Sequence, residues 1–425
     1  MQALGRRQFI KNGAFALGAS LVTSGVSFAR ADSATKSRFV FVILRGALDG
    51  LAVVPPFGDP DYAGLRRDLA LGAPGSSAGV LPLSHPFGLH PSCAFLHECF
   101  TARELVVFHA IASPYRERSH FDGQDVLENG NVRPHAVQTG WLNRALAAMP
   151  ASRGAQRELG VTLGQNVPLV MRGPAAVTSW SPSKLAALDD DTLQRITDLY
   201  ASDPLLAKRL ADALAADEIA GSAQMARDGT DAQPSDAQPT KQDADQLAKR
   251  GKSGARYIEV VNAAAGFLRR EDGPQVAVFD TTGWDTHANE GSAEGQLAGR
   301  LAALDSGLRM LKEQLGPAWQ DTAVVLATEF GRTAAVNGTR GTDHGTGAAA
   351  FLVGGAVRGG RVVADWPGLS ARALYQGRDL RPTLDLRSVL KGVLQEHLLV
   401  PYDAVESSVF PDSGDAKVAR GLIRT

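Results

Sequence analysis

The chain contains few cysteines, and this shortage excludes several kinds of cofactor site. Only Cys93 and Cys99 are present among 425 residues, in the segment PSCAFLHECF. We expect this segment to begin a helix, where six residues span about 9 Å, so the two thiols cannot form a disulfide. They are interpreted as small buried apolar side chains. Two cysteines are also too few for an iron–sulfur cluster or a thiolate-based structural zinc site.

An excess of basic charge is also lacking. The chain has 44 lysines and arginines against 45 aspartates and glutamates, a formal net charge of −1. No basic stripe with interleaved aromatic residues occurs, which argues against nucleic acid as a partner. The sequence has no phosphate-binding P-loop, no G-x-S-x-G elbow and no G-x-G-x-x-G after a strand, which disfavours nucleotide-binding and serine-hydrolase functions.

Long apolar runs are lacking after the first thirty residues, so no stable membrane span is expected in the mature chain. The N-terminus itself reads GRRQFIK, then the mildly apolar stretch AFALGASLVTSGVSF, then Ala29-Arg30-Ala31. This order predicts a cleaved signal over residues 1–31, and the stretch is short for a membrane anchor. Arg6-Arg7 indicates the twin-arginine route, so the translocase is an expected partner and the location is periplasmic or secreted.

Five short apolar runs predict the strands of a buried sheet, and helical patterns lie between several of them. The fold class is therefore α/β, a mainly parallel sheet flanked by helices. One stripe of leucines at four-three spacing predicts a helix over about 294–316. Residues 36–425 are expected to form a single domain with a low-complexity insertion at about 220–250. The runs are FVFVIL, ELVVFHAI, PQVAVFDT, TAVVLATEF and AAAFLV.

Polar residues follow these runs, at the edge of a parallel sheet where ligands bind. Arg45 and Asp49 follow the first run, Ser119 and His120 the second, Asp285 and His287 the third, and Glu329 and Arg332 the fourth, whereas Asp343 and His344 directly precede the fifth in GTDHGTG. Carboxylates mixed with imidazoles suit zinc, manganese, iron or magnesium. Glycines 341, 345 and 347 are expected to give the backbone the freedom that lets these side chains converge. The alternative for GTDHG is a polar turn.

Two further assignments stay open between a structural and a functional role. Ser119 begins a predicted helix, so it is either an N-cap or a nucleophile. Arg45 and Arg332 either neutralise neighbouring carboxylates or form a fork for an anionic oxygen. The remaining histidines are interpreted as satisfied structural residues.

The motifs LRGALDGL, HPS, RSHFDGQD, GW, DTH, TEFGRT and GTDHGTG occur in this order along the mature chain. Together they resemble the exported bacterial family known as domain of unknown function 1501, which is placed in the alkaline phosphatase-like superfamily with sulfatases. The resemblance implies an alkaline phosphatase-like core, a twin-arginine signal and a co-encoded exported partner. It also implies metal-ligand roles for Asp49, Asp285, His287, Glu329 and His344. Where that superfamily has Asp-His-Gly, this chain has Glu329-Phe330-Gly331, and no clear nucleophile motif is present.

These observations predict an exported metal-dependent hydrolase acting on a small phosphate or sulfate ester. The metal ligands are expected to be Asp49, Asp285, His287, Asp343 and His344, and Glu329 is expected to act as a ligand or base. Arg45 or Arg332 would stabilise the developing charge. Ser119 is the nearest nucleophile candidate, and His120 would protonate the leaving group. The alternative is a non-catalytic periplasmic binding or assembly protein that keeps the fold. A redox protein is a third possibility, disfavoured by the scarcity of cysteine.

Overall fold

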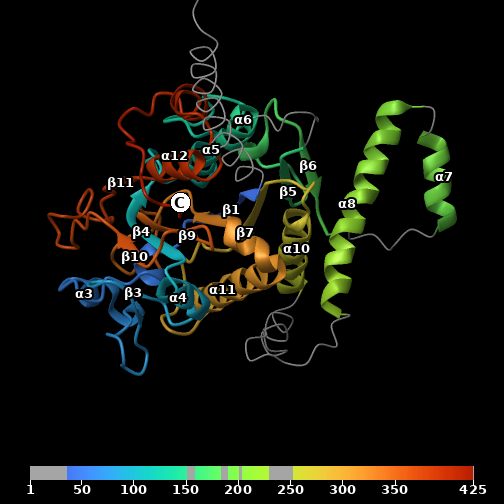
Figure 1. Cartoon of the computed structure of the whole chain (residues 1–425). Helices are drawn as coiled ribbons and strands as arrows, with labels where there is room; N and C mark the ends of the chain where they lie inside the picture. The colour runs from blue at the N-terminus through green and yellow to red at the C-terminus, as the bar shows by residue number, and fades with distance from the viewer. Residues whose placement is uncertain (1–35, 151–157, 183–189, 201–202, 229–251, 425) are drawn as a thin grey trace, which may run out of the picture.

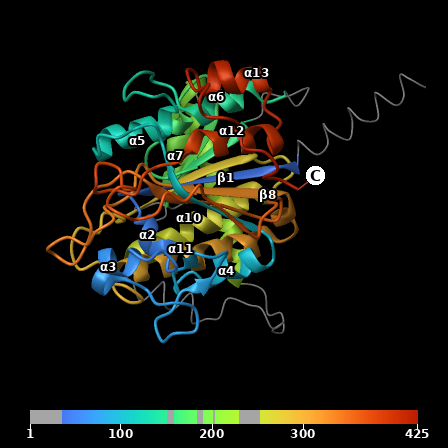
Figure 2. The same ribbon diagram turned by 90° about the vertical axis from the view of Figure 1, so that its left-hand side faces the viewer.

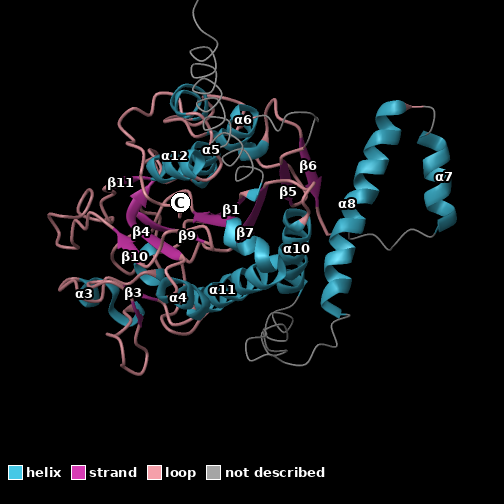
Figure 3. Cartoon of the chain, viewed as in Figure 1, coloured by secondary structure: helices cyan, strands magenta, loops and turns pink. Residues whose placement is uncertain are grey.

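The structure is a computed structural model that describes residues 36–150, 158–182, 190–200, 203–228 and 252–424. The predicted signal over 1–31 lies outside the described residues, as does most of the predicted insertion. Within the described residues, nine strands form one mixed sheet with the order β10-β4-β9-β8-β1-β7-β5-β6, and β11 pairs with β4 (Figure 3). The strands are β1 (Arg38–Arg45), β4 (Leu105–Ala112), β5 (Gly160–Leu163), β6 (Val177–Trp180), β7 (Val276–Thr282), β8 (Thr322–Ala327), β9 (Ala348–Val353), β10 (Arg361–Val363) and β11 (Leu384–Asp385).

Helices cover both faces of this sheet, as the prediction of an α/β fold requires (Figures 1 and 2). One layer contains α5 (His120–Asn129), α6 (Trp141–Ala148) and α12 (Leu386–Glu396); the other contains α4 (Ala94–Thr101), α10 (Lys252–Arg269) and α11 (Gln296–Leu315). The central strand β1 is buried on both sides because its apolar residues alternate between two cores. Val40, Val42 and Leu44 face the α10–α11 layer, whereas Phe39, Phe41 and Ile43 face the α6–α12 layer.

The predicted leucine stripe forms α11. Leu297, Leu301, Leu304, Leu308 and Leu311 are all 2% exposed or less and belong to the core between α11 and the sheet. Burying each of these side chains contributes roughly 1.5–3 kcal/mol to folding. The cysteine prediction is also confirmed, since Cys93 and Cys99 are free and buried at the start and within α4.

The segment between β6 and β7 contains α7 (Asp190–Tyr200) and α8 (Pro204–Asp228). Asp203 Oδ1 accepts hydrogen bonds from the backbone N–H groups of Leu205 and Leu206 and so caps the start of α8. The predicted insertion begins inside α8, and residues 229–251 lie outside the described residues. Figure 1 shows α7 standing away from the body, with α8 between it and α10.

Strand β9 runs opposite to its neighbours. It pairs antiparallel with β8 and with β4, whereas β1 pairs parallel with β7 and β8. The N-terminal end of β9 therefore lies at the edge where β1, β4, β7 and β8 end. This reversal brings GTDHG, which precedes β9, to the same edge as the loops that follow the other strands. None of the described helices is both long enough and apolar enough to span a bilayer.

Candidate metal centre

Loops from four parts of the chain meet at this edge of the sheet. Asp285 and His287 lie on the loop after β7, and His344 lies on the loop before β9. His120 is the first residue of α5, whose start is fixed by the extended backbone of Ser119 and whose end is fixed by Gly130 in the left-handed conformation. The loops before β9 and after β8 are joined by a backbone bridge between Arg332 and His344.

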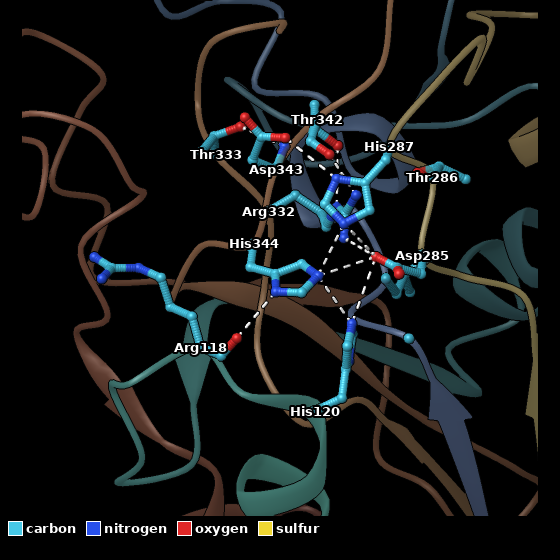
Figure 4. A network of polar contacts seen from close by, with 12 residues as sticks. Arg118, His120, Asp285, Thr286, His287, Arg332, Thr333, Thr342, Asp343 and His344 are labelled. Atoms are coloured by element: carbon cyan, nitrogen blue, oxygen red, sulfur yellow. Dashed lines mark hydrogen bonds and ion pairs between the residues drawn. The ribbon is translucent and has the colours of Figure 1, made fainter. Parts of the chain in front are cut away.

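Three imidazoles converge with one carboxylate at the centre of these loops (Figure 4). The Nε2 atom of His344 lies 2.9 Å from Nε2 of His120 and 2.9 Å from Nε2 of His287. Asp285 Oδ1 lies 3.0, 3.2 and 3.5 Å from Nε2 of His287, His344 and His120 respectively. Ligand atoms on a tetrahedral zinc ion lie about 3.3 Å apart. The spacing is therefore compatible with ligands that share one cation.

The second nitrogen of each ring is held by an oxygen acceptor. Nδ1 of His120 lies 2.8 Å from Glu329 Oε1, and Nδ1 of His287 lies 3.2 Å from Asp343 Oδ1. Nδ1 of His344 lies 2.9 Å from the backbone carbonyl oxygen of Arg118. Since carboxylates and carbonyls only accept hydrogen bonds here, each Nδ1 carries the proton in this arrangement. Metal-bound histidines in proteins are oriented in the same way.

This tautomer leaves three Nε2 lone pairs directed at one another and at the Asp285 carboxylate. Such a collection of electron pairs is unfavourable unless a positive charge lies among them. His120, Asp285 and His344 alone place three potential ligand atoms within 4.8 Å of one another. The donor set, imidazole with carboxylate, suits zinc, manganese or iron.

The charges around the cluster keep its carboxylates ionised. Burial opposes ionisation of Asp285, but the hydrogen bond from Arg332 Nη1 at 2.5 Å lowers the pKa of Asp285 below its usual value. Glu329 is completely buried, which by itself raises its pKa, yet hydrogen bonds from His120 and from its surroundings lower the pKa overall. The hydrogen bond from Asn337 Nδ2 at 3.0 Å is the main cause of a lowered pKa at Asp343.

The surroundings of the cluster shift the pKa values of His120 and His344 in opposite directions. The Glu329 hydrogen bond raises the pKa of His120, whereas burial, and next the neighbouring His120, lowers the pKa of His344. The ring of Phe330 lies against both, with centroids 5.0 Å from His120 and 5.4 Å from His344. This packing fixes the ring planes, which helps to fix where the Nε2 atoms point.

The sequence matches the family model described as "Protein of unknown function (DUF1501)" over residues 109–406, more than half of the chain. The chain belongs to the DUF1501 family. No curated protein matches it. Among solved structures, a phosphonate monoester hydrolase of Agrobacterium radiobacter is similar at 11% identity and a TM-score of 0.28, covering 77% of this chain and 70% of that chain.

Asp49, predicted as a metal ligand, lies apart from the imidazole cluster of this DUF1501 chain. Its Oδ1 accepts hydrogen bonds from the backbone N–H groups of Leu51 and Ala52 and so caps α2 (Gly50–Val53), while Oδ2 lies 2.5 Å from Arg66 Nη2. Arg66, at the end of α3 (Tyr62–Arg66), is fully buried and also lies 3.5 Å from Glu290. Both oxygens of Asp49 are therefore engaged by protein groups.

Asp343 and Glu329 are also placed differently from their predicted roles. Both hold the Nδ1 atoms of histidines, so they orient ligands and are not themselves placed among the converging Nε2 atoms. His120, predicted as a proton donor to the leaving group, takes a place among the candidate ligands instead. A histidine at the first position of a helix gives no sequence signal that separates these two roles, because both need an exposed imidazole.

The contacts of Arg332 and Arg45 favour pairing with carboxylates, whereas the contacts of Ser119 do not decide between cap and nucleophile. Arg332 is 1% exposed and its guanidinium contacts Asp285 and Thr342, so it pairs with carboxylate rather than facing solvent. Arg45 pairs with Glu128 at 2.8 Å and with Asp280. Ser119 occupies the N-cap position of α5, but its side chain makes no capping hydrogen bond.

The glycines of GTDHGTG act through close approach of backbones, not through unusual backbone angles. A Cβ atom at Gly341 would lie 2.4 Å from the carbonyl oxygen of Thr286, and one at Gly345 would lie 2.3 Å from Arg332. At Gly347 it would lie 2.6 Å from the carbonyl oxygen of Leu380. These glycines let the loops pack tightly enough for His287 and His344 to meet.

Proposed function

We propose that this protein is an exported metal-dependent hydrolase that cleaves a phosphate or sulfate ester. The observation that carries the proposal is the convergence of three Nε2 atoms on Asp285 with every Nδ1 held by an oxygen. His120, His287, His344 and Asp285 would hold the cation. A divalent cation in such a site polarises the ester and lowers the pKa of water, which makes hydrolysis possible near neutral pH.

The protein residues have separate tasks in this proposal. Arg332 holds Asp285 in place and cannot itself meet a substrate, because its side chain is fully buried. His287 and Asp285 are 44% and 40% exposed at their side chains, so an ester reaches the cluster from their side. Glu329 and Asp343 fix the orientation of His120 and His287. We assign the attack to water: its oxygen bonds to phosphorus or sulfur, the ester bond to the leaving oxygen breaks, and the alcohol departs with a proton.

Ser119 is the alternative nucleophile. It precedes His120 directly, and its hydroxyl is not used as a helix cap. A Ser119→Ala variant distinguishes the two routes, since water attack survives the substitution and serine attack does not.

The test compares two histidine variants of the purified mature chain. His344→Ala removes the imidazole that contacts both of the others, so we expect it to lose bound metal and to lower turnover of aryl phosphate or aryl sulfate by at least about 100-fold. His97→Ala is the control, because His97 contacts the carbonyl of Pro82 and lies on α4, away from the cluster. Equal metal content and equal turnover in the two variants would refute the proposal.

The same experiment separates the enzyme from a non-catalytic binding or assembly protein. Phe330 occupies a position where the resembled superfamily has a histidine, which is consistent with lost turnover. Metal bound at the cluster without hydrolysis of any phosphate or sulfate ester favours the binding protein.

Export through the twin-arginine route is the second part of the proposal. It rests on GRRQFIK and on Ala29-Arg30-Ala31 in the sequence. Changing Arg6 and Arg7 to lysine is expected to keep the protein in the cytoplasm, as measured by cell fractionation. Periplasmic protein at the wild-type level in that variant would remove the assignment.

A further inference from the structure

A large cavity lies beside the candidate metal centre, and the proposed reaction does not account for its size. Its volume is about 1050 Å³, and it is bounded by α5, α10, the first turns of α11, the end of β7 and the loop between β5 and η2 (Leu169–Met171). Sites for small molecules typically measure 300–1,000 Å³, which is enough for a drug-sized ligand. A phosphate or sulfate group alone would fill only a small part of this cavity.

The cavity borders the cluster through residues next to its candidate ligands. Phe121 follows His120 in the chain, and Trp284 precedes Asp285; both line the cavity. Gln124 also lines it, and its Nε2 donates a hydrogen bond of 3.2 Å to Glu329 Oε1, the atom that holds His120. The cavity and the cluster therefore adjoin at the first turn of α5 and at the loop after β7.

On the cavity wall, as far as the structure describes the chain, the acidic residues have charged or imidazole partners, whereas most of the arginines do not. The acidic residues all have partners: Glu128 and Asp280 pair with Arg45, and Asp125 lies 3.3 Å from His135. Three other arginines of the wall, Arg172, Arg256 and Arg300, have no carboxylate within 4.0 Å among the described residues. Within the described part of the chain, Arg172 and Arg300 donate to the backbone carbonyls of Val167 and Gly283 respectively. The wall has four arginines against three carboxylates, a formal net charge of +1, and this balance favours an anionic ligand.

Apolar surface accompanies this charge. Phe121 is 87% exposed in the first turn of α5, although an aromatic ring of this size is usually covered. Leu163, Val167 and Leu169 come from the loop region opposite. A ligand that covers Phe121 and also pairs with the arginines must have an apolar part and an anionic group.

We infer that the cavity binds the organic part of the ester, and that this part is apolar, ring-bearing and carries a second anionic group. The substrate class is thus a bulky organic ester with a further sulfate, phosphate, sulfonate or carboxylate group, not a small monoester. Placing the reacting ester at the cluster rests on the proposed function. Binding in the cavity itself does not, so the two can be tested apart.

The test uses two dyes that differ by one charged group. 8-Anilinonaphthalene-1-sulfonate is an apolar ring system with a sulfonate, and N-phenyl-1-naphthylamine has the same rings without it. We expect one sulfonate dye to bind per chain, at least about tenfold more tightly than the neutral dye, because a charge-assisted hydrogen bond to guanidinium is lost in the latter. Fluorescence titration measures both affinities.

Variants assign this binding to the cavity. Arg172→Gln and Arg300→Gln are each expected to weaken the sulfonate dye several-fold and the double variant more, with little change for the neutral dye; Phe121→Ala should weaken both dyes. Arg372→Gln is the matched control, since Arg372 is exposed and does not line the cavity. Arg172 is exposed, so Arg172→Gln is expected to fold normally. It remains available as the test variant if Arg300→Gln does not fold.

Equal affinity for the two dyes, or arginine variants that bind the sulfonate dye like Arg372→Gln, would overturn the inference. The titration is repeated in His344→Ala, where retained binding supports a cavity that works without the metal cluster. Naphthyl phosphates with and without a ring sulfonate then test the substrate class, and the sulfonated ester should have the lower KM. Selective dye binding without turnover of either ester would refute the hydrolase and leave the cavity assignment standing.

Discussion

Glu329 is not among the candidate metal ligands, but its carboxylate orients His120, which is one of them. It accepts from Nδ1 of His120 at 2.8 Å, from the backbone N–H of Gly46 at 2.9 Å and from Gln124. A Glu329→Gln variant keeps the shape but removes the charge, so His120 becomes a weaker and less well oriented ligand. We expect the metal dissociation constant to rise roughly 10- to 100-fold.

The measurement is a metal titration with a competing chelator. Glu98→Gln is the control, since Glu98 is an exposed acid on α4 that pairs with Arg309. An unchanged dissociation constant in Glu329→Gln would mean that the His120–Glu329 contact has no part in holding a cation.

At the scale of single residues, the sequence predicted that several of these side chains meet, but not the contacts that each of them makes. Asp285, His287 and His344 follow or precede apolar runs, and that position was enough to predict that they meet. The capture of Asp49 by Arg66, 17 residues later, could not be predicted because nothing in the intervening sequence distinguishes a buried guanidinium from an exposed one. The backbone carbonyl of Arg118 orients His344. This contact could not be predicted from residue types because every residue has a backbone carbonyl.

At the scale of elements, the sequence predicted five of the nine strands of the main sheet, but not the direction in which each runs. AAAFLV is apolar throughout, as expected for a strand buried on both faces, and such a run contains no information on direction. Its reversal relative to β8 and β4 is nevertheless what brings His344 to the metal cluster.

Strand β4 contains a buried histidine that should make stability depend on pH. Nε2 of His109 lies 2.9 Å from the carbonyl oxygen of Val54, and Nδ1 accepts from the backbone N–H of Ala110 at 2.8 Å. The contact with Ala110 requires an unprotonated Nδ1 and therefore the neutral ring, and burial lowers the pKa of His109 from 6.5 to about 4. Its contribution is complete above the ordinary pKa and is lost as pH falls from 6.5 towards 4. The loss amounts to roughly 3 kcal/mol.

Urea unfolding at several pH values checks this expectation. Subtracting the curve of His109→Gln from that of the wild type isolates the pH dependence of this residue, and His97→Gln, altered at the protein surface, serves as control. A difference curve that stays flat between pH 7 and pH 4 would show that His109 is not held neutral by the fold.

At the scale of the whole molecule, the fold class was predicted from alternating apolar runs and helical stripes, because burial patterns are repeated over many residues. The same patterns could not predict that the carboxylates at this end of the sheet form two separate clusters, which we call the outer and the inner cluster. The outer one contains Asp285 with the three imidazoles; the inner one contains Asp49 and Glu290, both buried, with Arg66 between them.

The inner cluster is already balanced by protein charges. Burial, and next the neighbouring Asp49, raises the pKa of Glu290, so this carboxyl holds its proton more tightly than usual. Asp49 then forms an ion pair with the guanidinium of Arg66, which cannot lose its proton. A second cation would have to replace Arg66 as the partner of Asp49. This exchange is costly because it leaves the buried charge of Arg66 without a partner.

We therefore predict one cation per chain, bound at the outer cluster only. Mass spectrometry of the purified protein should give a metal-to-chain ratio near one, and saturating metal at about 100 times its dissociation constant should stabilise the fold by about 2.7 kcal/mol. Asp285→Asn should abolish both effects, whereas Asp49→Asn, although destabilised by the unpaired Arg66, should keep one cation. Two cations in the wild type and one in Asp49→Asn would instead identify the inner cluster as a second metal site and Arg66 as a group that moves aside for it.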